Sequence, residues 1–350
     1  MIDFRYHIVS IVSIFLALAV GILLGAGPLQ EDLGTTLTNQ VSTLRQEKTD
    51  LRTQLDTVQQ RLEADDEFAT DVTPQLVGSR LGGYPIVLVT LPGADADAAT
   101  ELATVLTASG ATITGTVAVT GGWTDPAKAS ARERLATSLA PVVGTGDGSA
   151  DATSSDATSG GATADATSGG ATPSDAGPDD AAADLDVRLG RLLAGALVVP
   201  RLTDAGRTTT ASTQTLAGLA KADLVTFDGA GPVLAALAIV IAPPPDPKQT
   251  DERRAADLSG WLGLARALDA RGRGAAVVGD PASATSGGLV AAVRSDAAAR
   301  VISTVDSLAR PMGRIATVYA LREQVAGGAG QYGTGAGATA VLPTLPAAGP

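Results

Sequence analysis

The sequence predicts an α/β protein attached to a membrane. An N-terminal transmembrane helix and a coiled-coil helix precede a mostly parallel α/β sheet domain, which a disordered insertion interrupts. Three observations lead to this fold class: an apolar run at residues 8–27, a heptad repeat over residues 37–62, and an alternation of short apolar strands with helical segments from residue 84 onward. Strands that are joined by helices form largely parallel sheets.

The apolar run at residues 8–27 contains no ionisable side chain, and its only polar residues are Ser10 and Ser13. A helix of that length is about 30 Å long, enough to span the hydrocarbon core of a bilayer while satisfying its own backbone hydrogen bonds. A cleaved secretory signal is the alternative, because Arg5 precedes the run and small residues end it. The apolar core of such a signal is usually about 7 to 15 residues long, so we expect an uncleaved anchor.

The charges around this span favour one orientation. Arg5 lies before the span, whereas the first charges after it are Glu31 and Asp32. Because Lys and Arg tend to stay inside, we expect the short N-terminal end to remain inside and the C-terminal body to be exported. The absence of cysteine fits an exported chain without disulfides and would equally fit a cytosolic one. The sequence predicts a cell-envelope membrane and leaves inner against outer membrane undecided.

A heptad pattern follows the span. Apolar residues, with one lysine among them, alternate spacings of four and three and form a predicted coiled-coil seam: Leu37, Val41, Leu44, Lys48, Leu51, Leu55, Val58 and Leu62. In this register Lys48 is a polar a position, and Glu47 could pair with Arg52 of a parallel partner. We therefore expect a homo-oligomer, most simply a dimer. The alternative is an amphipathic helix packed on the chain's own body.

The membrane segment carries a matching pattern of small residues. Ser13, Ala17, Gly21 and Gly25 recur at every fourth position and include a Gly-x-x-x-Gly pair. Small residues at this spacing allow two membrane helices to approach closely. Next to a heptad repeat, the pattern supports the same parallel pairing.

The strands and helices of the body are read from apolar runs and their punctuation by Gly and Pro. Pro74 and the glycines at 78, 82 and 83 are expected to end the stalk helix. Strands are predicted at residues 85–91, 113–119, 196–199, 224–227, 237–242, 275–279 and 301–305. Helices are predicted at residues 94–109, 129–139, 185–193, 212–220, 251–270, 287–299 and 312–325.

These elements divide the chain into six segments. They are a membrane anchor (1–30), a coiled-coil stalk (31–72), the first part of the α/β domain (80–142), a low-complexity insertion (143–183), the second part of the domain (184–326) and a flexible tail (327–350). The insertion repeats DATSGGAT at 156–163 and 165–172. It has few side chains to bury, so it is expected to be disordered. Eight aspartates between residues 147 and 184 account for most of the net charge of −12.

The residue types exclude several classes of chemistry. His7, beside the membrane span, is the only histidine, and there is no cysteine, so triads and zinc sites of the common kinds are not expected in the body. No cluster of basic and aromatic residues suggests nucleic acid binding. Loop carboxylates are interpreted as helix caps or solvated groups, not as catalytic pairs: Asp95, Asp97, Asp280 and Asp306. We predict no catalytic residues and do not expect an enzyme.

Two ligand motifs also fail on context. Gly328, Gly330 and Gly333 match G-x-G-x-x-G, but they follow the last helix without the βαβ unit that holds a pyrophosphate, so the match is interpreted as chance. Copper(I) prefers thiolate and thioether ligands, and the chain offers only Met1 and Met312 besides its single histidine. No cluster of these can form within one chain. No cofactor is predicted, and the metal ligands are unknown.

Two stretches resemble the actinobacterial MctB family, whose members are described as copper transport proteins of the envelope. They are the opening MIDFRYHIVSIVSIFLALAVGILLGAG and residues 300–333, RVISTVDSLARPMGRIATVYALREQVAGGAGQYG. The resemblance implies a role in copper homeostasis or efflux, as a channel or transport component. Related proteins are also linked to cell separation with a partner membrane protein. The alternative is therefore a non-enzymatic dimeric scaffold acting with a partner in cell separation or cell-wall hydrolase control.

Overall fold

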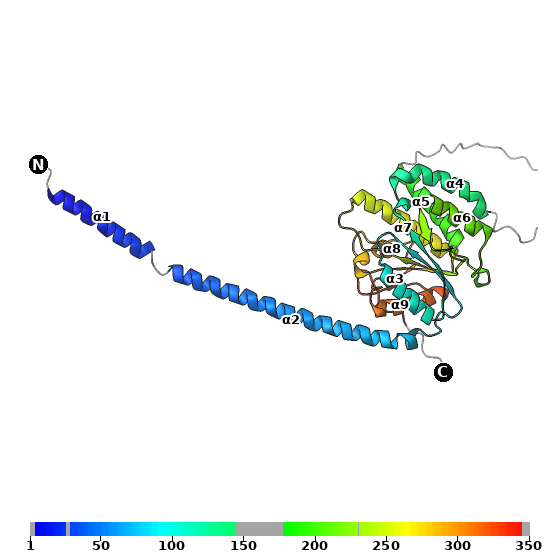
Figure 1. Cartoon of the computed structure of the whole chain (residues 1–350), viewed down its shortest axis with the longest axis horizontal. Helices are drawn as coiled ribbons and strands as arrows, with labels where there is room; N and C mark the ends of the chain where they lie inside the picture. Colours follow the sequence, from blue (N-terminus) through cyan, green and yellow to red (C-terminus); the bar gives the residue numbers. More distant parts are fainter. Residues whose placement is uncertain (1–3, 26–28, 145–177, 230, 345–350) are drawn as a thin grey trace, which may run out of the picture. The chain divides into compact units, whose positions relative to one another are not determined.

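The computed structural model describes residues 4–25, 29–144, 178–229 and 231–344; side chains are described for these except at 24, 29–38, 141–144 and 178–183. The chain divides into two compact units, Met1–Glu67 and Phe68–Pro350, which are considered separately below. Figure 1 shows the long helices of the first unit and the layered body of the second.

Two helices dominate the N-terminal part. Helix α1 spans Phe4–Gly25 and helix α2 spans Leu29–Val77. The stretch Phe4–Leu23 is long and apolar enough to cross a membrane, with a mean hydropathy of 2.3, and none of it is buried. The predicted N-terminal apolar helix is therefore confirmed.

Helix α2 ends directly before Gly78, the first of the glycines expected to end it, but it passes through Pro74, which was expected to help end it. The helix continues to Val77, and Gly78 N–H then donates to Pro74 O at 3.0 Å. Proline lacks only its own N–H, so a last turn can still form beyond it. Val77 is fully buried in the core of the sheet domain, which gives that turn a tertiary partner.

The body is built on one seven-stranded sheet with the order β3-β2-β1-β4-β5-β6-β7. Neighbouring strands are parallel except β2 and β3, which are antiparallel. This confirms the predicted mostly parallel sheet. The strands are β1 Pro85–Thr90, β2 Thr112–Val119, β3 Val225–Phe227, β4 Leu237–Ile241, β5 Ala275–Val278, β6 Ser303–Val305 and β7 Gln331–Tyr332.

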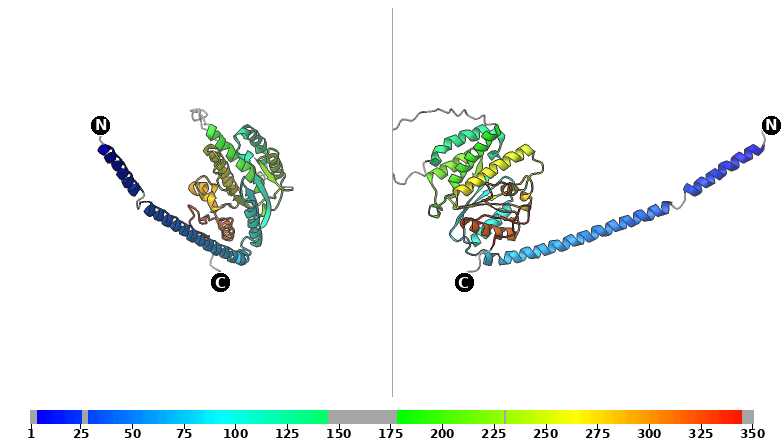
Figure 2. Two further views of the ribbon diagram at one scale, coloured as in Figure 1. Left: turned by 60° about the vertical axis from the view of Figure 1, so that its left-hand side comes forward. Right: turned by 180° about the vertical axis from the view of Figure 1, so that it is seen from behind.

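Helices cover both faces of this sheet (Figure 2). Helices α3 and α9 pack in the core of one face, and α4 to α8 contribute to the core of the other. Their bounds are α3 Ala96–Ala108, α4 Ala129–Gly144, α5 Pro178–Leu197, α6 Thr210–Lys221, α7 Asp251–Arg271, α8 Leu289–Ser295 and α9 Pro311–Val325. Short 3₁₀ helices are η1 Gly121–Trp123, η2 Pro126–Lys128, η3 Leu202–Asp204 and η4 Pro281–Ala284.

The central strands show why an unbroken apolar run predicts this architecture. In β1, Ile86 and Leu88 face the α3 and α9 side, while Val87 and Val89 face the opposite side, and all four are buried. A strand covered on both faces has no solvated side, so every position is apolar.

Three predictions are changed by the structure. The strand expected at 196–199 is mostly the end of α5, because Leu193 and Leu197 continue the buried face of that helix; only Val198 makes an isolated bridge, with Ala235. Within the segment 327–350 that was expected to be a flexible tail, β7 joins the sheet beside β6. Most of the 143–183 insertion lies outside the described residues, while α4 extends to Gly144 and α5 begins at Pro178.

Candidate functional site at the switch point of the sheet

A cavity of about 530 Å³ lies at the carboxyl ends of the central strands. The chain leaves β1 toward β2 on one side and later continues from β4 toward β5 on the other, so the strand order reverses between β1 and β4. Loops that follow neighbouring parallel strands separate at such a point and leave a crevice, where ligands of open α/β sheets bind. The lining comes from residues 92–93, 121–124, 243–249 and 287–289, together with one face of α7.

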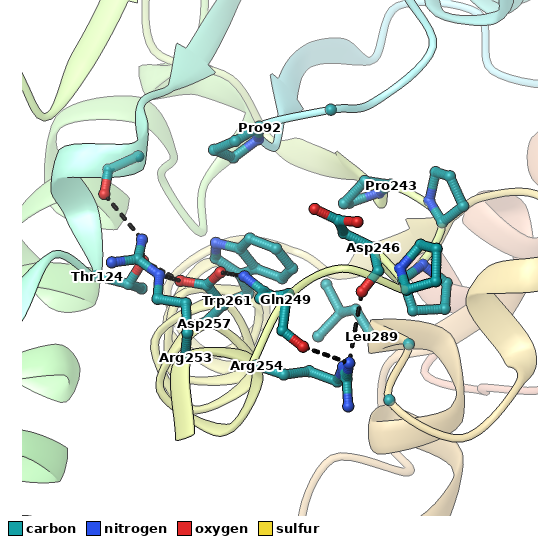
Figure 3. A pocket seen from close by; sticks show the side chains of 17 residues that line it. Pro92, Thr124, Pro243, Asp246, Gln249, Arg253, Arg254, Asp257, Trp261 and Leu289 are labelled. Carbon is teal, nitrogen blue, oxygen red and sulfur yellow. Dashed lines mark hydrogen bonds and ion pairs between the residues drawn. The ribbon is translucent and has the colours of Figure 1, made fainter. Parts of the chain in front are cut away.

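One wall of the cavity is apolar and stiff. Four of its prolines lie in the PPPDP sequence at 243–247, directly after β4. Proline has a fixed φ and no N–H, so this run both ends the strand and holds a rigid loop. Leu289 extends this apolar lining, and Trp261 adds an apolar surface from α7. Pro92 and Pro243 lie on one side of the opening, with Arg253 and Arg254 on the other (Figure 3).

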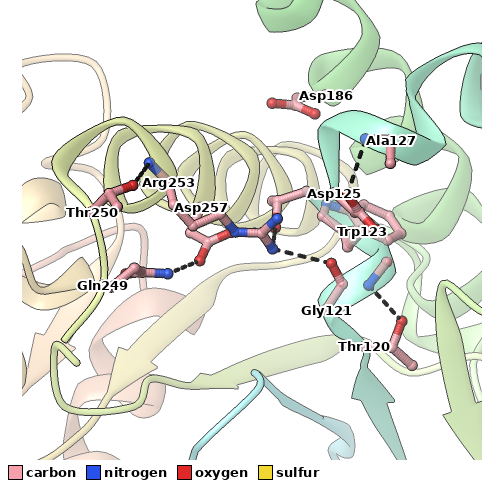
Figure 4. A network of polar contacts seen from close by, with 12 residues as sticks. Thr120, Gly121, Trp123, Asp125, Ala127, Asp186, Gln249, Thr250, Arg253 and Asp257 are labelled. Carbon is pink, nitrogen blue, oxygen red and sulfur yellow. Dashed lines mark hydrogen bonds and ion pairs between the residues drawn. The ribbon is translucent and has the colours of Figure 1, made fainter.

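The opposite wall is a polar network centred on Asp257, which is 5% exposed (Figure 4). Gln249 Nε2 donates to Asp257 Oδ2 at 2.6 Å, and Arg253 Nε lies 3.1 Å from Asp257 Oδ1. Thr124 Oγ1 donates to the same carboxylate. Arg253 also donates to Gly121 O at 3.2 Å and to Thr124 Oγ1 at 3.0 Å. One carboxylate therefore ties together the connections after β2 and β4 and helix α7.

The spacing along α7 places these side chains on the cavity. Arg253, Asp257 and Trp261 follow one another at every fourth residue, and this spacing puts them on one helix face. Gly260 lies beside this face, and a Cβ there would come 2.6 Å from Thr124 Cγ2. Only glycine lets α7 approach the 121–124 connection this closely.

A second ion pair supports the network from behind. Arg132 NH1 lies 3.1 Å from Asp186 Oδ1 and also donates to Trp123 O, while its NH2 donates to Asp125 O at 3.3 Å. Burial raises the pKa of the Asp186 carboxyl, and the charge of Arg132 opposes part of that shift. The pair clamps the loop around the fully buried Trp123, which positions Thr124 at the cavity.

The donor set of the cavity suits recognition of a ligand. It offers amide, hydroxyl, carboxylate and guanidinium groups, most of them already paired with one another. Within the residues that the structure describes, no group of three or more His, Cys, Asp or Glu side chains could hold a metal ion. The softest donor of the body, Met312, lies on α9 and is not part of the cavity lining. Copper(I), which prefers sulfur ligands, is therefore poorly matched to this site.

The loop carboxylates considered from the sequence do not form the cavity. Asp95 caps α3, accepting from Asp97 N at 2.9 Å and from Ala98 N at 3.1 Å. Asp280 precedes η4, and its Oδ1 is buried without a hydrogen-bond partner in the described chain. Neither of these two carboxylates lines the cavity.

Asp306 belongs to a closed buried cluster. Arg294 donates to Asp306 Oδ2 at 2.7 Å and to Tyr332 O at 2.7 Å. The backbone N–H groups of Thr334 and Gly335 donate to the two oxygens of Asp306 at 2.8 and 2.9 Å. The 331–335 segment thus packs on the carboxylate, which explains the order of a stretch that sequence patterns do not predict.

The G-x-G-x-x-G match proves to be part of this packing. A Cβ on Gly333 would come 2.0 Å from Asp306 Oδ1, and a Cβ on Gly330 would come 2.0 Å from the Tyr332 hydroxyl. A third glycine of the match, Gly328, would meet the Glu323 side chain. These glycines are explained by close internal contacts, with no βαβ unit around them.

The residues predicted to pack between copies lie on the helices of the first unit. Ser13, Ala17, Gly21 and Gly25 are exposed along α1, and the Ser13 hydroxyl donates to Val9 O at 2.8 Å. The seam residues of α2 whose side chains are described are all exposed: Val41, Leu44, Lys48, Leu51, Leu55, Val58 and Leu62. Leu37 lies in α2, but its side chain is outside the description.

Sequence reasoning missed the cavity residues. Thr124 and Asp257 are 133 positions apart, so no local pattern pairs them. The available signal was local to two segments: the proline run directly after a buried strand, and the four-residue spacing of Arg253, Asp257 and Trp261 on the next helix.

Fold and site together define the class of protein: an α/β body with a recognition cavity at the switch point of its sheet, in a chain that begins with one apolar helix able to span a membrane. The family model described as "Copper transport outer membrane protein, MctB" matches residues 1–343. The chain therefore belongs to the MctB family, which confirms the resemblance of its two end segments.

Curated relatives cover almost the whole chain. The "Copper transporter MctB" of Mycobacterium tuberculosis (strain ATCC 25618 / H37Rv) is 29% identical over 97% of this chain and 99% of its own length. The "Copper transporter MctB" of Mycobacterium leprae (strain TN) is 30% identical over the same shares. These names describe copper transport and not an enzyme activity, and the family name with the apolar helix fits a membrane-anchored envelope protein.

Proposed function

We propose that this chain is an anchored component of a copper homeostasis or efflux system in the cell envelope. Its body would be exported and would work by recognising a ligand or partner at the switch-point cavity. The observation that carries the proposal is the similarity over 97% of the chain to relatives named as copper transporters. The apolar stretch Phe4–Leu23 supplies the anchor.

The chemistry of the cavity assigns it a role other than holding copper. Its polar wall is made of oxygen and nitrogen groups that already pair around Asp257, with Trp261 beside them on α7, and its other wall is mainly proline. A pocket with apolar walls and a few fixed polar groups is suited to an organic ligand or a partner segment. In this proposal, copper transport depends on the organic ligand or partner segment that binds in the cavity.

The anchored helices support assembly as a parallel dimer. On α2 the described apolar seam residues are between 42% and 68% exposed: Val41, Leu44, Leu51, Leu55, Val58 and Leu62. A seam of this spacing packs against an identical helix, and a single lysine at an a position favours one register. Because each chain has one candidate span in its described part, any conducting path through the membrane would need several copies.

Cysteine crosslinking tests the dimer directly, since the natural chain has no cysteine. Leu44→Cys or Leu51→Cys should give an inter-chain disulfide in membranes under mild oxidation, because d positions of parallel partners face each other. Gln46→Cys, on the outer face of the same helix, is the matched control and should remain monomeric. Equal crosslinking of Leu44→Cys and Gln46→Cys would contradict the parallel seam.

Deletion tests the copper function. A strain without this chain should stop growing at a lower copper concentration than its parent and should accumulate more cell copper. The full-length gene should reverse both effects. Normal copper tolerance in the deletion strain would contradict the proposal. Chains of unseparated cells with normal copper tolerance would instead support the alternative role in cell separation.

A further inference from the structure

A second concave surface lies away from the switch-point cavity, between α5 and α7. This α5–α7 groove has a volume of about 510 Å³, within the usual range of ligand pockets, and its lining is mostly apolar. Val187, Ala194 and Gly195 come from α5, and Gly263, Ala267 and Ala270 come from α7.

The groove exists because two helices with small side chains run side by side in the same direction. A Cβ on Gly263 would lie 3.9 Å from Val187 N, and a Cβ on Gly272 would lie 3.6 Å from Val198 Cβ, so the contacts advance together along both helices. Gly190 is so close to α7 that a Cβ would come 3.1 Å from Gly263 O. Outside that contact line, alanine and glycine leave an open channel about 12 Å long over nine residues of each helix.

The rim of the groove is cationic. Arg191 from α5 and Arg266 and Arg271 from α7 line it, and no carboxylate does, although the chain has 37 acidic and 25 basic residues. The register that places Gly263 beside Val187 brings Arg191 and Arg266 to the same level on opposite walls.

Two of these arginines keep capacity for a ligand. Arg191 is exposed and pairs with no acid within the described residues. Arg266 is paired with Asp296, but its Nε is buried and has no hydrogen-bond partner in the described chain. Arginines on the two walls of an apolar channel suit an anionic head group, with an alkyl tail along the alanine and glycine floor.

We propose that the α5–α7 groove binds an anionic amphiphile, a molecule with a carboxylate or phosphate head and one alkyl chain in the channel. The head would lie between Arg191 and Arg266, and the chain would run toward Val187 and Gly263. A neutral amphiphile would leave Arg191 without a counter-charge and Arg266 Nε without an acceptor, so affinity depends on the charge of the head. This inference is independent of the copper function.

The test uses the full-length chain in phosphatidylcholine nanodiscs and a palmitic acid that carries a photoreactive diazirine on its chain. Crosslinked peptides, located by mass spectrometry, should come from residues 187–195 and 263–271. The diazirine-labelled methyl ester, which has no charge, should label these peptides about tenfold less, as expected for loss of one charge-assisted contact.

Two variants and a control give the test its specificity. Arg191→Glu reverses the rim charge and Ala270→Trp fills the channel; both positions are exposed, so the fold should be retained. Each should reduce labelling about tenfold. Arg201→Glu makes the same charge change outside the groove and should leave labelling unchanged. Thermal unfolding followed by circular dichroism checks that all variants are folded.

Adding phosphatidylglycerol to the nanodiscs distinguishes the source of the head group. Competition by this lipid assigns the groove to an anionic membrane lipid, and no competition assigns it to a free fatty acid; either result supports the proposal when the variants lose labelling. Undiminished labelling of folded Arg191→Glu and Ala270→Trp, or equal labelling by acid and ester, would overturn it. Labelling confined to peptides of other elements would overturn it as well.

Discussion

Two arginine–aspartate pairs lie on the carboxyl side of the same sheet and differ in how they are enclosed. In the Arg294–Asp306 pair, the side chains are 4% and 0% exposed. In the Arg253–Asp257 pair, they are 31% and 7% exposed. The first pair is covered by the backbone of residues 334–336, and the second forms a wall of the switch-point cavity.

This difference in enclosure distinguishes the Arg294–Asp306 pair, called the closed pair below, from the Arg253–Asp257 pair, called the open pair. The closed pair is structural, and the open pair belongs to the candidate site. Asp306 accepts hydrogen bonds from an arginine and two backbone N–H groups and is fully buried, so a ligand cannot reach its oxygens. Asp257 instead joins three segments, and its arginine partner is accessible from the cavity. Removing one partner of a buried pair lowers the free energy of unfolding strongly, because the remaining charge is uncompensated. Exposed pairs contribute little to stability.

The largest expected effect comes from breaking the closed pair. Asp306→Ala leaves Arg294 buried without its counter-charge and should lower the free energy of unfolding by about 3–5 kcal/mol. Urea denaturation of the full-length protein measures this. The control is Glu133→Ala in the exposed Arg188–Glu133 pair, 3.9 Å apart, which should change stability by about 0–1 kcal/mol. Equal losses in both variants would show that the enclosure of Asp306 has no energetic consequence.

The next effect tests the close approach of α7 to the cavity wall. Gly260→Ala places a Cβ 2.6 Å from Thr124 Cγ2 and should cost about 1–3 kcal/mol of unfolding free energy through overpacking.

The matched control lies one helical turn away. Gly263→Ala makes only contacts of 3.8 Å or more, and alanine favours a helix over glycine, so it should be neutral or stabilising by up to about 1 kcal/mol. If Gly260→Ala were as stable as Gly263→Ala, the wall of the cavity would not depend on that glycine.

A smaller loss is expected when the open pair is weakened. Asp257→Asn keeps the shape of the side chain but removes the charge that faces Arg253, and should cost about 1–2 kcal/mol. Because Arg253 can turn to solvent, the loss should be less than in Asp306→Ala. Denaturant midpoints of the two variants, measured side by side, decide the order; a reversed order would contradict the distinction between closed and open pairs.

The smallest effect is a change in pH dependence. Burial raises the pKa of Asp186 above its ordinary value of 3.8, with Arg132 opposing part of the shift. The folded protein therefore holds this proton to higher pH than the unfolded chain does, so stability from this group falls as the pH rises from 3.8 to the raised pKa. Asp186→Asn should remove that part of the slope in unfolding curves recorded against pH. An unchanged slope would contradict the role of burial.

Much of the fold follows from local patterns in the sequence. Runs such as PIVLVTL and LAIVIA have no polar face, and this predicts buried strands in a sheet with helices on both sides, as β1 and β4 confirm. The two-residue strand β7 has no periodicity to detect, and its order comes from Asp306 and Arg294. The end of α5 was misassigned because a short apolar run fits a strand and a buried helix equally well.

The candidate site was less predictable than the fold. Carboxylates near strand ends were visible, but the one on the cavity, Asp257, comes from a helix and meets Thr124 only through the tertiary fold. The predicted packing of α1 and α2 between copies remains a prediction, because it concerns contacts with a second chain.

The cavity can be blocked without disturbing its walls. Gly121 is exposed and lines the cavity, and a Cβ on it would meet no atom within 4 Å, so Gly121→Trp should place a bulky ring at the cavity without displacing its neighbours. Ser130→Trp adds the same bulk on the exposed surface of α4, outside the cavity lining.

The most direct measurement of the central claim is copper tolerance of the deletion strain when it carries each of these variants at equal membrane levels. We expect that Ser130→Trp restores growth in copper as the natural chain does, while Gly121→Trp leaves the cells as sensitive as the deletion. Full copper tolerance with Gly121→Trp would contradict the claim that the switch-point cavity carries the copper function.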